Sequence, residues 1–264
     1  MEVNIEGQTY SMELDLGFRG DLNLHSEYVE KIASKTFLKT KPMYGIKGKE
    51  FVSNLYALPK AKIGQMAFFE STLQEDSRDF TINSVFLKDG AEPSIGEPGR
   101  LGWQFFHSVN LLIDVSNSTI AFCDSLDTLK EQGYLIENVA EVPLLLERGL
   151  VEFIGEGPEG PLRCTLDTGC TLNLMNTDIE EEKVAEALWN PEFVLYLPSL
   201  KIGEVDFGPQ RFQKFPIKLP IRIEATLGME FFKDHLVFVN FTNKTIYFTK
   251  SAQIPSEPPL DKFD

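Results

Sequence analysis

The chain has 264 residues, of which 42% are hydrophobic and 25% are charged, as in an ordinary globular protein. Its formal net charge of −15 argues against binding to nucleic acid or to an anionic membrane surface, because both need clustered Lys and Arg. The 3 cysteines cannot all pair with one another, so no disulfide framework is expected. No membrane-spanning run and no signal peptide are visible, and the compartment stays open.

The first half begins with an apolar strand that ends in Leu14-Asp15-Leu16-Gly17. Ser26 can then cap a short helix that carries Tyr28, Val29 and Ile32. The half is expected to close with a short helix at Trp103–Phe106 and with two strands joined by an Asn-centred turn within residues 111–122. Most of the remaining sequence alternates between apolar and polar residues, as β-strands do.

The second half begins in the same way, with an apolar strand that ends in Leu166-Asp167-Thr168-Gly169. Thr177 and Glu180 form a capping-box pattern, which predicts a helix over the apolar residues that follow. A short helix at Met229–Phe232 and a final hairpin within residues 237–248 are expected after it.

Four patterns of the first half therefore return in the second half in the same order. In the first pair, residues 14–17 and 22–24 correspond to residues 166–169 and 172–174. The other pairs are residues 58–64 with 197–203, residues 101–106 with 227–232, and residues 111–122 with 237–248. Any one match could be chance, but matches in register indicate an internal duplication. We expect lobes at residues 1–127 and 142–253, a linker at 128–141 and a Pro-rich tail at 254–264.

The segment Leu166-Asp167-Thr168-Gly169 resembles the Asp-Thr-Gly active-site loop of pepsin-like and retropepsin-like aspartic peptidases. Residues 225–228 are similar to the family's element that closes this loop. In the first half, Asp15-Leu16-Gly17-Phe18-Arg19-Gly20 resembles a variant form seen in some bacterial retropepsin-like proteins, with residues 99–102 as its closing element. The resemblance implies a mostly β, two-lobed acid-protease fold and an aspartic endopeptidase that needs no cofactor or metal.

Two aspartates suit this reaction because peptide hydrolysis by this route needs two carboxyl groups around one water molecule. Held about 3 Å apart, the carboxyl groups of Asp15 and Asp167 cannot both ionise and would share one proton. The ionised partner would act as general base, and the protonated partner would polarise the substrate carbonyl. The pair titrates as a unit, so neither role is assigned to a single residue.

Residues beside the aspartates are expected to support the loops. Gly17 and Gly169 would let the backbone approach the carboxylates and donate N–H bonds. The resemblance implies that Thr168 bonds across to the opposite loop, whereas its counterpart Leu16 cannot form such a bond. Leu16, Phe18, Tyr44 and Cys170 are expected to line the cleft between the lobes.

A hairpin is predicted where two strand-like runs within residues 41–52 flank a Gly-Ile-Lys-Gly tip. It resembles the glycine-tipped flap that closes over substrate in this family. Tyr44, Gly45, Ile46 and Gly48 would then contact the substrate. A plain surface loop is the alternative.

Other classes of site find little support. His25, His107 and His235 have no metal-ligand spacing, and the cysteines Cys123, Cys164 and Cys170 have no positional support as nucleophiles. The expected partner is a peptide or protein substrate bound by a monomer. A catalytically inactive relative that binds a peptide or partner in the cleft, and a structural module with the same fold, remain the alternatives.

Overall fold

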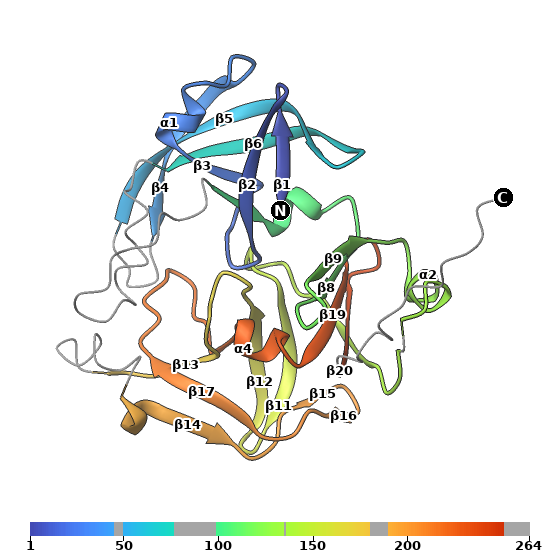
Figure 1. The fold of residues 1–264 in the computed structure, drawn as a ribbon. Coiled ribbons are helices and arrows are strands. Elements are labelled where there is room, and N and C mark those ends of the chain that lie inside the picture. The colour runs from blue at the N-terminus through green and yellow to red at the C-terminus, as the bar shows by residue number, and fades with distance from the viewer. Residues whose placement is uncertain (45–49, 77–98, 135, 180–189, 251–264) are drawn as a thin grey trace.

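A computed structural model describes residues 1–44, 50–76, 99–134, 136–179 and 190–250, and most of these residues lie in strands. The strands form two lobes, one above the other in Figure 1, and a third sheet beside both. The N-terminal lobe contains one sheet, whose members are β1 (Glu2–Ile5), β2 (Gln8–Asp15), β3 (Leu22–His25), β4 (Thr36–Tyr44), β5 (Glu50–Ile63), β6 (Met66–Asp76) and β7 (Gly99–Gly102).

The C-terminal lobe repeats this strand arrangement. Its sheet contains β11 (Glu152–Gly157), β12 (Gly160–Leu166), β13 (Leu174–Asn176), β14 (Val194–Leu197), β15 (Lys201–Ile202), β16 (Val205–Asp206), β17 (Gln210–Phe215) and β18 (Ala225–Leu227). The order β1-β2-β7-β3-β6-β5 in the first sheet corresponds to β11-β12-β18-β13-β17-β14 in the second. In both lobes the aspartate-bearing strand pairs in parallel with the strand of the closing element.

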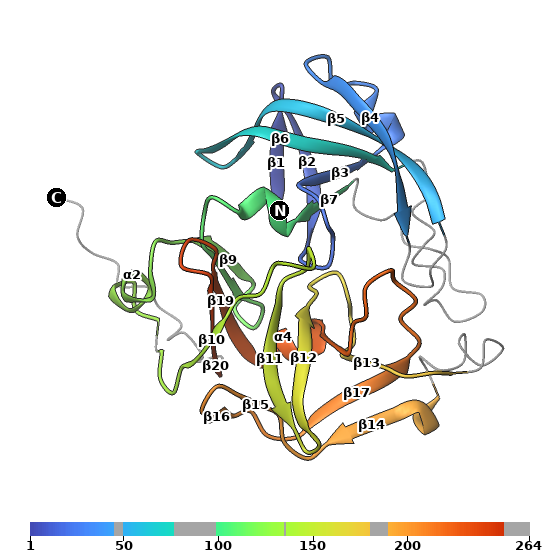
Figure 2. The ribbon, with the colours of Figure 1, turned by 180° about the vertical axis from the view of Figure 1, so that it is seen from behind.

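The third sheet is built from both halves of the chain. Its strands are β8 (Leu111–Asp114), β9 (Thr119–Phe122), β10 (Ala140–Pro143), β19 (His235–Asn240) and β20 (Thr245–Lys250). β8 pairs with β19 in antiparallel fashion, so the closing hairpins of the two halves lie side by side (Figure 2). Corresponding side chains hold the two turns, since Asp114 accepts from the N–H of Asn117 and Asn240 accepts from the N–H of Asn243.

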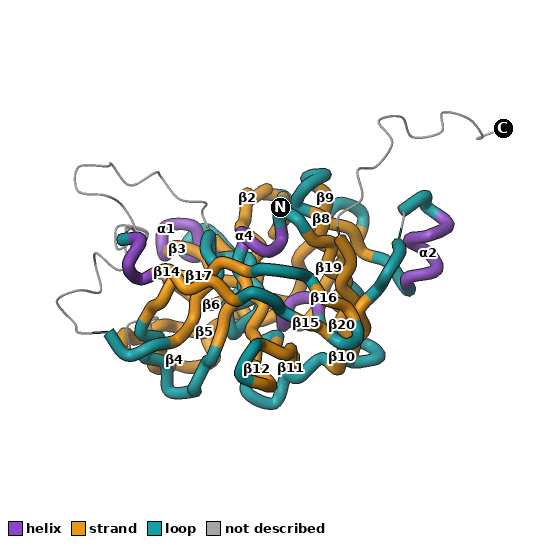
Figure 3. The backbone as a smooth tube through the Cα atoms, turned by 90° about the horizontal axis from the view of Figure 1, so that it is seen from below, coloured by secondary structure: helices purple, strands orange, loops and turns teal. Residues whose placement is uncertain are grey.

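The helices of the described residues are short. They are α1 (Ser26–Val29), α2 (Leu126–Glu131) and α4 (Met229–Phe232), with 3-10 turns η2 (Trp103–Phe106) and η4 (Pro191–Phe193). α2 lies in the segment between β9 and β10, apart from the strands (Figure 3). The helices predicted at Trp103–Phe106 and Met229–Phe232 are therefore confirmed. No helix among the described residues is long and apolar enough to cross a membrane.

The other helix predictions fared differently. Ser26 does not cap α1, because His25 occupies the cap position and Ser26 is the first helical residue. The Ser26 hydroxyl instead donates to the backbone oxygen of Asp76 on β6, at 3.3 Å. α2 was not predicted; it begins after Ser125, whose side chain accepts from the N–H of Thr128. The helix predicted after Thr177 falls largely outside the described residues.

The side chains of β2 point alternately to its two faces, and this alternation determines the face on which Asp15 lies. Tyr10, Met12 and Leu14 are buried in the hydrophobic core, so Glu13 and Asp15 lie on the opposite face of the strand. One contiguous cluster of buried side chains includes residues of both lobes and of the third sheet. Both aspartate-bearing strands are therefore anchored in the same core.

His235, at the start of β19, is a buried titratable group of this core. Its ring stacks on Phe231 with centroids 4.1 Å apart, and its Nδ1 lies 2.7 Å from the Phe231 backbone oxygen. Burial lowers the pKa of His235 below its ordinary value. The folded protein therefore resists protonation at this position more than the unfolded chain does.

The contribution of His235 to the stability of the protein should accordingly fall as the pH drops below about 6.5, where the unfolded chain takes up a proton that folded His235 refuses. One such group contributes at most about 1.4 kcal/mol per pH unit, down to the lowered folded pKa. Urea unfolding at several pH values measures the slope. His235→Leu should reduce it. An unchanged slope in His235→Leu would contradict this assignment.

Candidate active site

Two similar turns carry the aspartates. Asp15 is the last residue of β2, and Asp167 follows the last residue of β12. In each turn the aspartate backbone oxygen accepts from the N–H three residues later, that of Phe18 at 3.1 Å and that of Cys170 at 3.2 Å. The two lobes thus present their carboxyl groups from equivalent positions.

The turns bring the two carboxyl groups together. The Asp15 and Asp167 side chains are close enough for Asp15 to raise the pKa of Asp167. Each carboxyl group also lies over the glycine of the opposite turn: a Cβ on Gly17 would lie 2.4 Å from Cγ of Asp167, and a Cβ on Gly169 would lie 2.6 Å from Cγ of Asp15. Any side chain at these two positions would force the carboxyl groups apart, so glycine is required by the close approach.

The electrostatics of the pair favour one bound proton. Burial and the neighbouring Asp15 carboxyl group raise the pKa of Asp167 well above its ordinary value. The Gly169 N–H, which donates to Asp167 Oδ1 at 3.0 Å, and the Arg100 guanidinium act in the opposite direction. The Asp167 carboxyl group therefore favours its protonated form more than an exposed aspartate does.

Thr168 fastens the two turns to each other. Its hydroxyl donates to the backbone oxygen of Leu14 at 2.6 Å and accepts from the backbone N–H of Leu16 at 3.1 Å. Both bonds cross from the C-terminal lobe to the N-terminal lobe, and both are buried. One threonine therefore satisfies two backbone groups of the opposite turn.

The structure places the other expected cleft residues unequally. Leu16 is fully buried, so the expectation that it lines the cleft is wrong: its side chain packs in the core. Phe18 is nearly buried as well. Cys170 is partly exposed, and its thiol donates to the backbone oxygen of Leu172 at 3.1 Å. Burial, and next the Asp167 carboxyl group, raise the pKa of the Cys170 thiol, which disfavours a nucleophilic thiolate.

The predicted hairpin is formed by β4 and β5. The two strands pair in antiparallel fashion from Thr36 with Ala57 to Tyr44 with Glu50. Tyr44 lies at the end of β4 with 41% of its surface exposed. Gly45, Ile46 and Gly48 lie outside the described residues.

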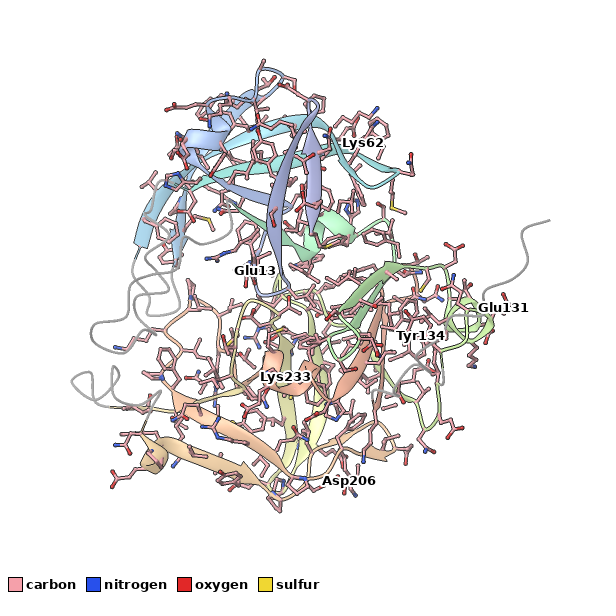
Figure 4. All side chains as sticks on the ribbon, viewed as in Figure 1. Glu13, Lys62, Glu131, Tyr134, Asp206 and Lys233 are labelled. Atoms are coloured by element: carbon pink, nitrogen blue, oxygen red, sulfur yellow. The ribbon has the colours of Figure 1, made fainter. Side chains whose placement is uncertain are left out.

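Arg100 and Glu13 are site residues that the motif comparison missed. Arg100, on β7, places Nη1 3.3 Å from Oδ2 of Asp15, and its Nε lies 3.9 Å from Oε2 of Glu13. Glu13 projects from β2, where the N-terminal lobe faces the C-terminal lobe (Figure 4). The signal was present in Gly99-Arg100-Leu101-Gly102, because this closing element carries a charge where Ala225-Thr226-Leu227-Gly228 carries none.

The comparisons with known proteins agree with this architecture. A solved structure of the aspartic proteinase from Irpex lacteus superimposes with a TM-score of 0.56 over 97% of this chain and 95% of that chain, at 12% sequence identity. The fold is that of a two-lobed acid protease. At this identity the likeness concerns the fold alone. No family model matches the sequence, and no curated protein matches it.

Other possible sites on this acid-protease fold do not involve the aspartates. A hollow of about 890 Å³ lies in the C-terminal lobe between β12 and β14, and neither aspartate lines it. Within the described part of the chain, no group of three or more His, Cys, Asp or Glu side chains could hold a metal ion. The aspartate pair is therefore the group on which a catalytic function can be argued.

Replacing Thr168 by Val should destabilise the protein by about 1–3 kcal/mol, because it leaves the buried N–H of Leu16 and the oxygen of Leu14 without their partner. Urea unfolding measures the change. Thr171→Val is the matched control, since Thr171 is exposed and lies in the same loop. Equal stabilities of the two variants would show that the bonds between the turns contribute nothing.

Proposed function

We propose that this protein is an aspartic endopeptidase that hydrolyses peptide bonds with a water molecule activated by Asp15 and Asp167. The observation that carries the proposal is the contact between the two carboxyl groups, one from each lobe, with a raised pKa at Asp167. Two carboxyl groups that are held close together, so that the pKa of one is raised, are typical of catalytic pairs. The acid-protease fold supports the proposal, since the Irpex lacteus structure is that of an aspartic proteinase.

The chemistry follows from the shared proton. The ionised carboxyl group removes a proton from water as the water oxygen attacks the peptide carbonyl carbon. The protonated carboxyl group hydrogen-bonds to the carbonyl oxygen and transfers its proton there. Collapse of the tetrahedral intermediate then needs a proton on the leaving nitrogen, which the pair can return. No metal ion or cofactor takes part in these steps.

The substrate in this proposal is an extended peptide or a segment of a protein. It would lie between the lobes and under the hairpin of β4 and β5, with backbone hydrogen bonds to the hairpin. Tyr44, Gly45, Ile46 and Gly48 are proposed to contact it, and closure of the hairpin would exclude water. Nucleic acid and membranes are not proposed as partners.

The domain organisation remains a proposal as well. Lobes at residues 1–127 and 142–253 would each contribute one aspartate, with a linker at 128–141 and a tail at 254–264. Because a single chain then carries both aspartates, a monomer would suffice. The equal strand orders of the two lobes support a duplicated unit.

A second candidate is a protein that binds a peptide or partner in the same place without cutting it. Leucine at position 16 favours this alternative, because the N-terminal turn then offers no hydroxyl to bond back across the lobes. The two candidates differ in what happens to a bound peptide.

A peptide library incubated with the protein from about pH 3 to about pH 7 should be cleaved, and Asp15→Asn and Asp167→Asn should each lower kcat by about 10³-fold or more. Activity should fall as the pH rises through the raised pKa of Asp167, because the pair then loses the proton that it shares. Mass spectrometry of the products measures the cleavage.

Asp234→Asn, at an exposed aspartate outside the site, is the control and should cleave as the wild type does. Cleavage that survives Asp167→Asn would refute the proposed mechanism. Peptide binding without cleavage by the wild type at any pH would favour the second candidate.

A further inference from the structure

The two lobes differ in the residue that lies beside each aspartate-bearing strand. In the parallel pairing of β7 with β2, Arg100 lies opposite Glu13, which is two residues before Asp15. At the equivalent position of the other lobe, Thr226 on β18 lies opposite Thr165 on β12, which is two residues before Asp167. Both threonines are buried and uncharged. The closing strand therefore supplies a cation to Asp15, whereas it supplies no charge to Asp167.

The position of Arg100 lets it act on the pair directly. Its Nη1 lies 3.3 Å from Oδ2 of Asp15, and the two side chains are 23% and 8% exposed. Its contact with Glu13 is longer, at 3.9 Å, and the Glu13 side chain is 45% exposed. Water screens the Glu13 contact more strongly, so the buried contact with Asp15 is the more effective of the two.

The neighbouring described elements contribute a neutral amide, a thiol and a paired carboxylate. On β3, the residue opposite Arg100 is Asn23, whose amide is neutral. In the C-terminal turn, a raised pKa favours the neutral form of Cys170. On α4, Glu230 is paired with Arg211 at 3.2 Å. Arg100 is thus a charge in direct contact with Asp15.

We propose that Arg100 is a positioning residue of the aspartate pair, whose guanidinium holds Asp15 as the carboxylate anion and leaves the shared proton on Asp167. This inference rests on the proposed function and assigns the two roles that function requires. Asp15 accepts a proton from the attacking water while the water oxygen bonds to the carbonyl carbon. Asp167 donates its proton to the carbonyl oxygen as the C=O double bond becomes a single bond, so the tetrahedral intermediate is a neutral diol.

Titration of the carboxyl groups tests this assignment without any substrate. The aspartates are labelled with ¹³C at the carboxyl carbon, and the two resonances are assigned with Asp15→Asn and Asp167→Asn. In the wild type, Asp15 should ionise at a lower pH than Asp167. Arg100→Met should raise the pH at which the pair loses its first proton, because it removes the cation 3.3 Å from Asp15, and the pH profile of kcat/KM should move upward with it.

Arg100→Lys keeps the charge and should titrate close to the wild type. Arg100→Gln is a second neutral variant, which repeats the test if Arg100→Met does not fold. Arg211→Met is the matched control, because it removes an arginine that is paired with Glu230 and does not contact the aspartates. It should leave the titration of the pair unchanged.

The proposal is overturned if Asp167 ionises before Asp15, or if the neutral Arg100 variants titrate as the wild type does. It is also overturned if Arg211→Met shifts the pair as much as Arg100→Met. If no peptide is cleaved, the proposed function fails. The titration of the aspartates can still be measured, so the role of Arg100 in holding the charge on Asp15 is tested separately.

Discussion

The structure depends on holding the carboxyl groups of Asp15 and Asp167 close together at the junction of two lobes. Two ionised carboxylates at this distance would repel each other strongly, so the contact exists only with a shared proton and with surroundings that compensate. Gly17 and Gly169 provide the space, because each carboxyl group lies over the opposite glycine. Thr168 ties the backbones of the two turns. The sheets behind the turns then need to be anchored in one core, which the continuous cluster of buried side chains provides.

An approximate twofold arrangement has acquired unequal surroundings. The strand orders of the lobes correspond, and so do the turns that carry the aspartates. Yet Thr168 faces a buried Leu16, and Arg100 corresponds to Thr226. A symmetric pair would share its proton equally. Of the two closing strands, β7 places a cation beside Asp15 and β18 places an uncharged threonine at the equivalent position, which gives a physical reason for the two carboxyl groups to take different parts in a reaction.

The third sheet explains how two similar lobes become one body. β8 of the first half pairs with β19 of the second, and β10 pairs with β20. Trp103, which follows the closing element of the N-terminal lobe, donates its indole N–H to the backbone oxygen of Gly149 and stacks on Phe241.

The sequence by itself determined the strands, the repeat and the two aspartate turns, because these depend on local patterns: alternation, glycines beside Asp15 and Asp167, and turn residues such as Asn117 and Asn243. It also indicated that Thr168 would bond across the lobes, through a motif. The tertiary structure alone decided that Leu16 is buried, that Ser26 bonds to β6 instead of capping its helix, and that Arg100 reaches Asp15. Each of these outcomes depends on which strands become neighbours. Arg100 is 85 residues from Asp15 in sequence, and only the parallel pairing of β2 with β7 places its charge beside that carboxylate.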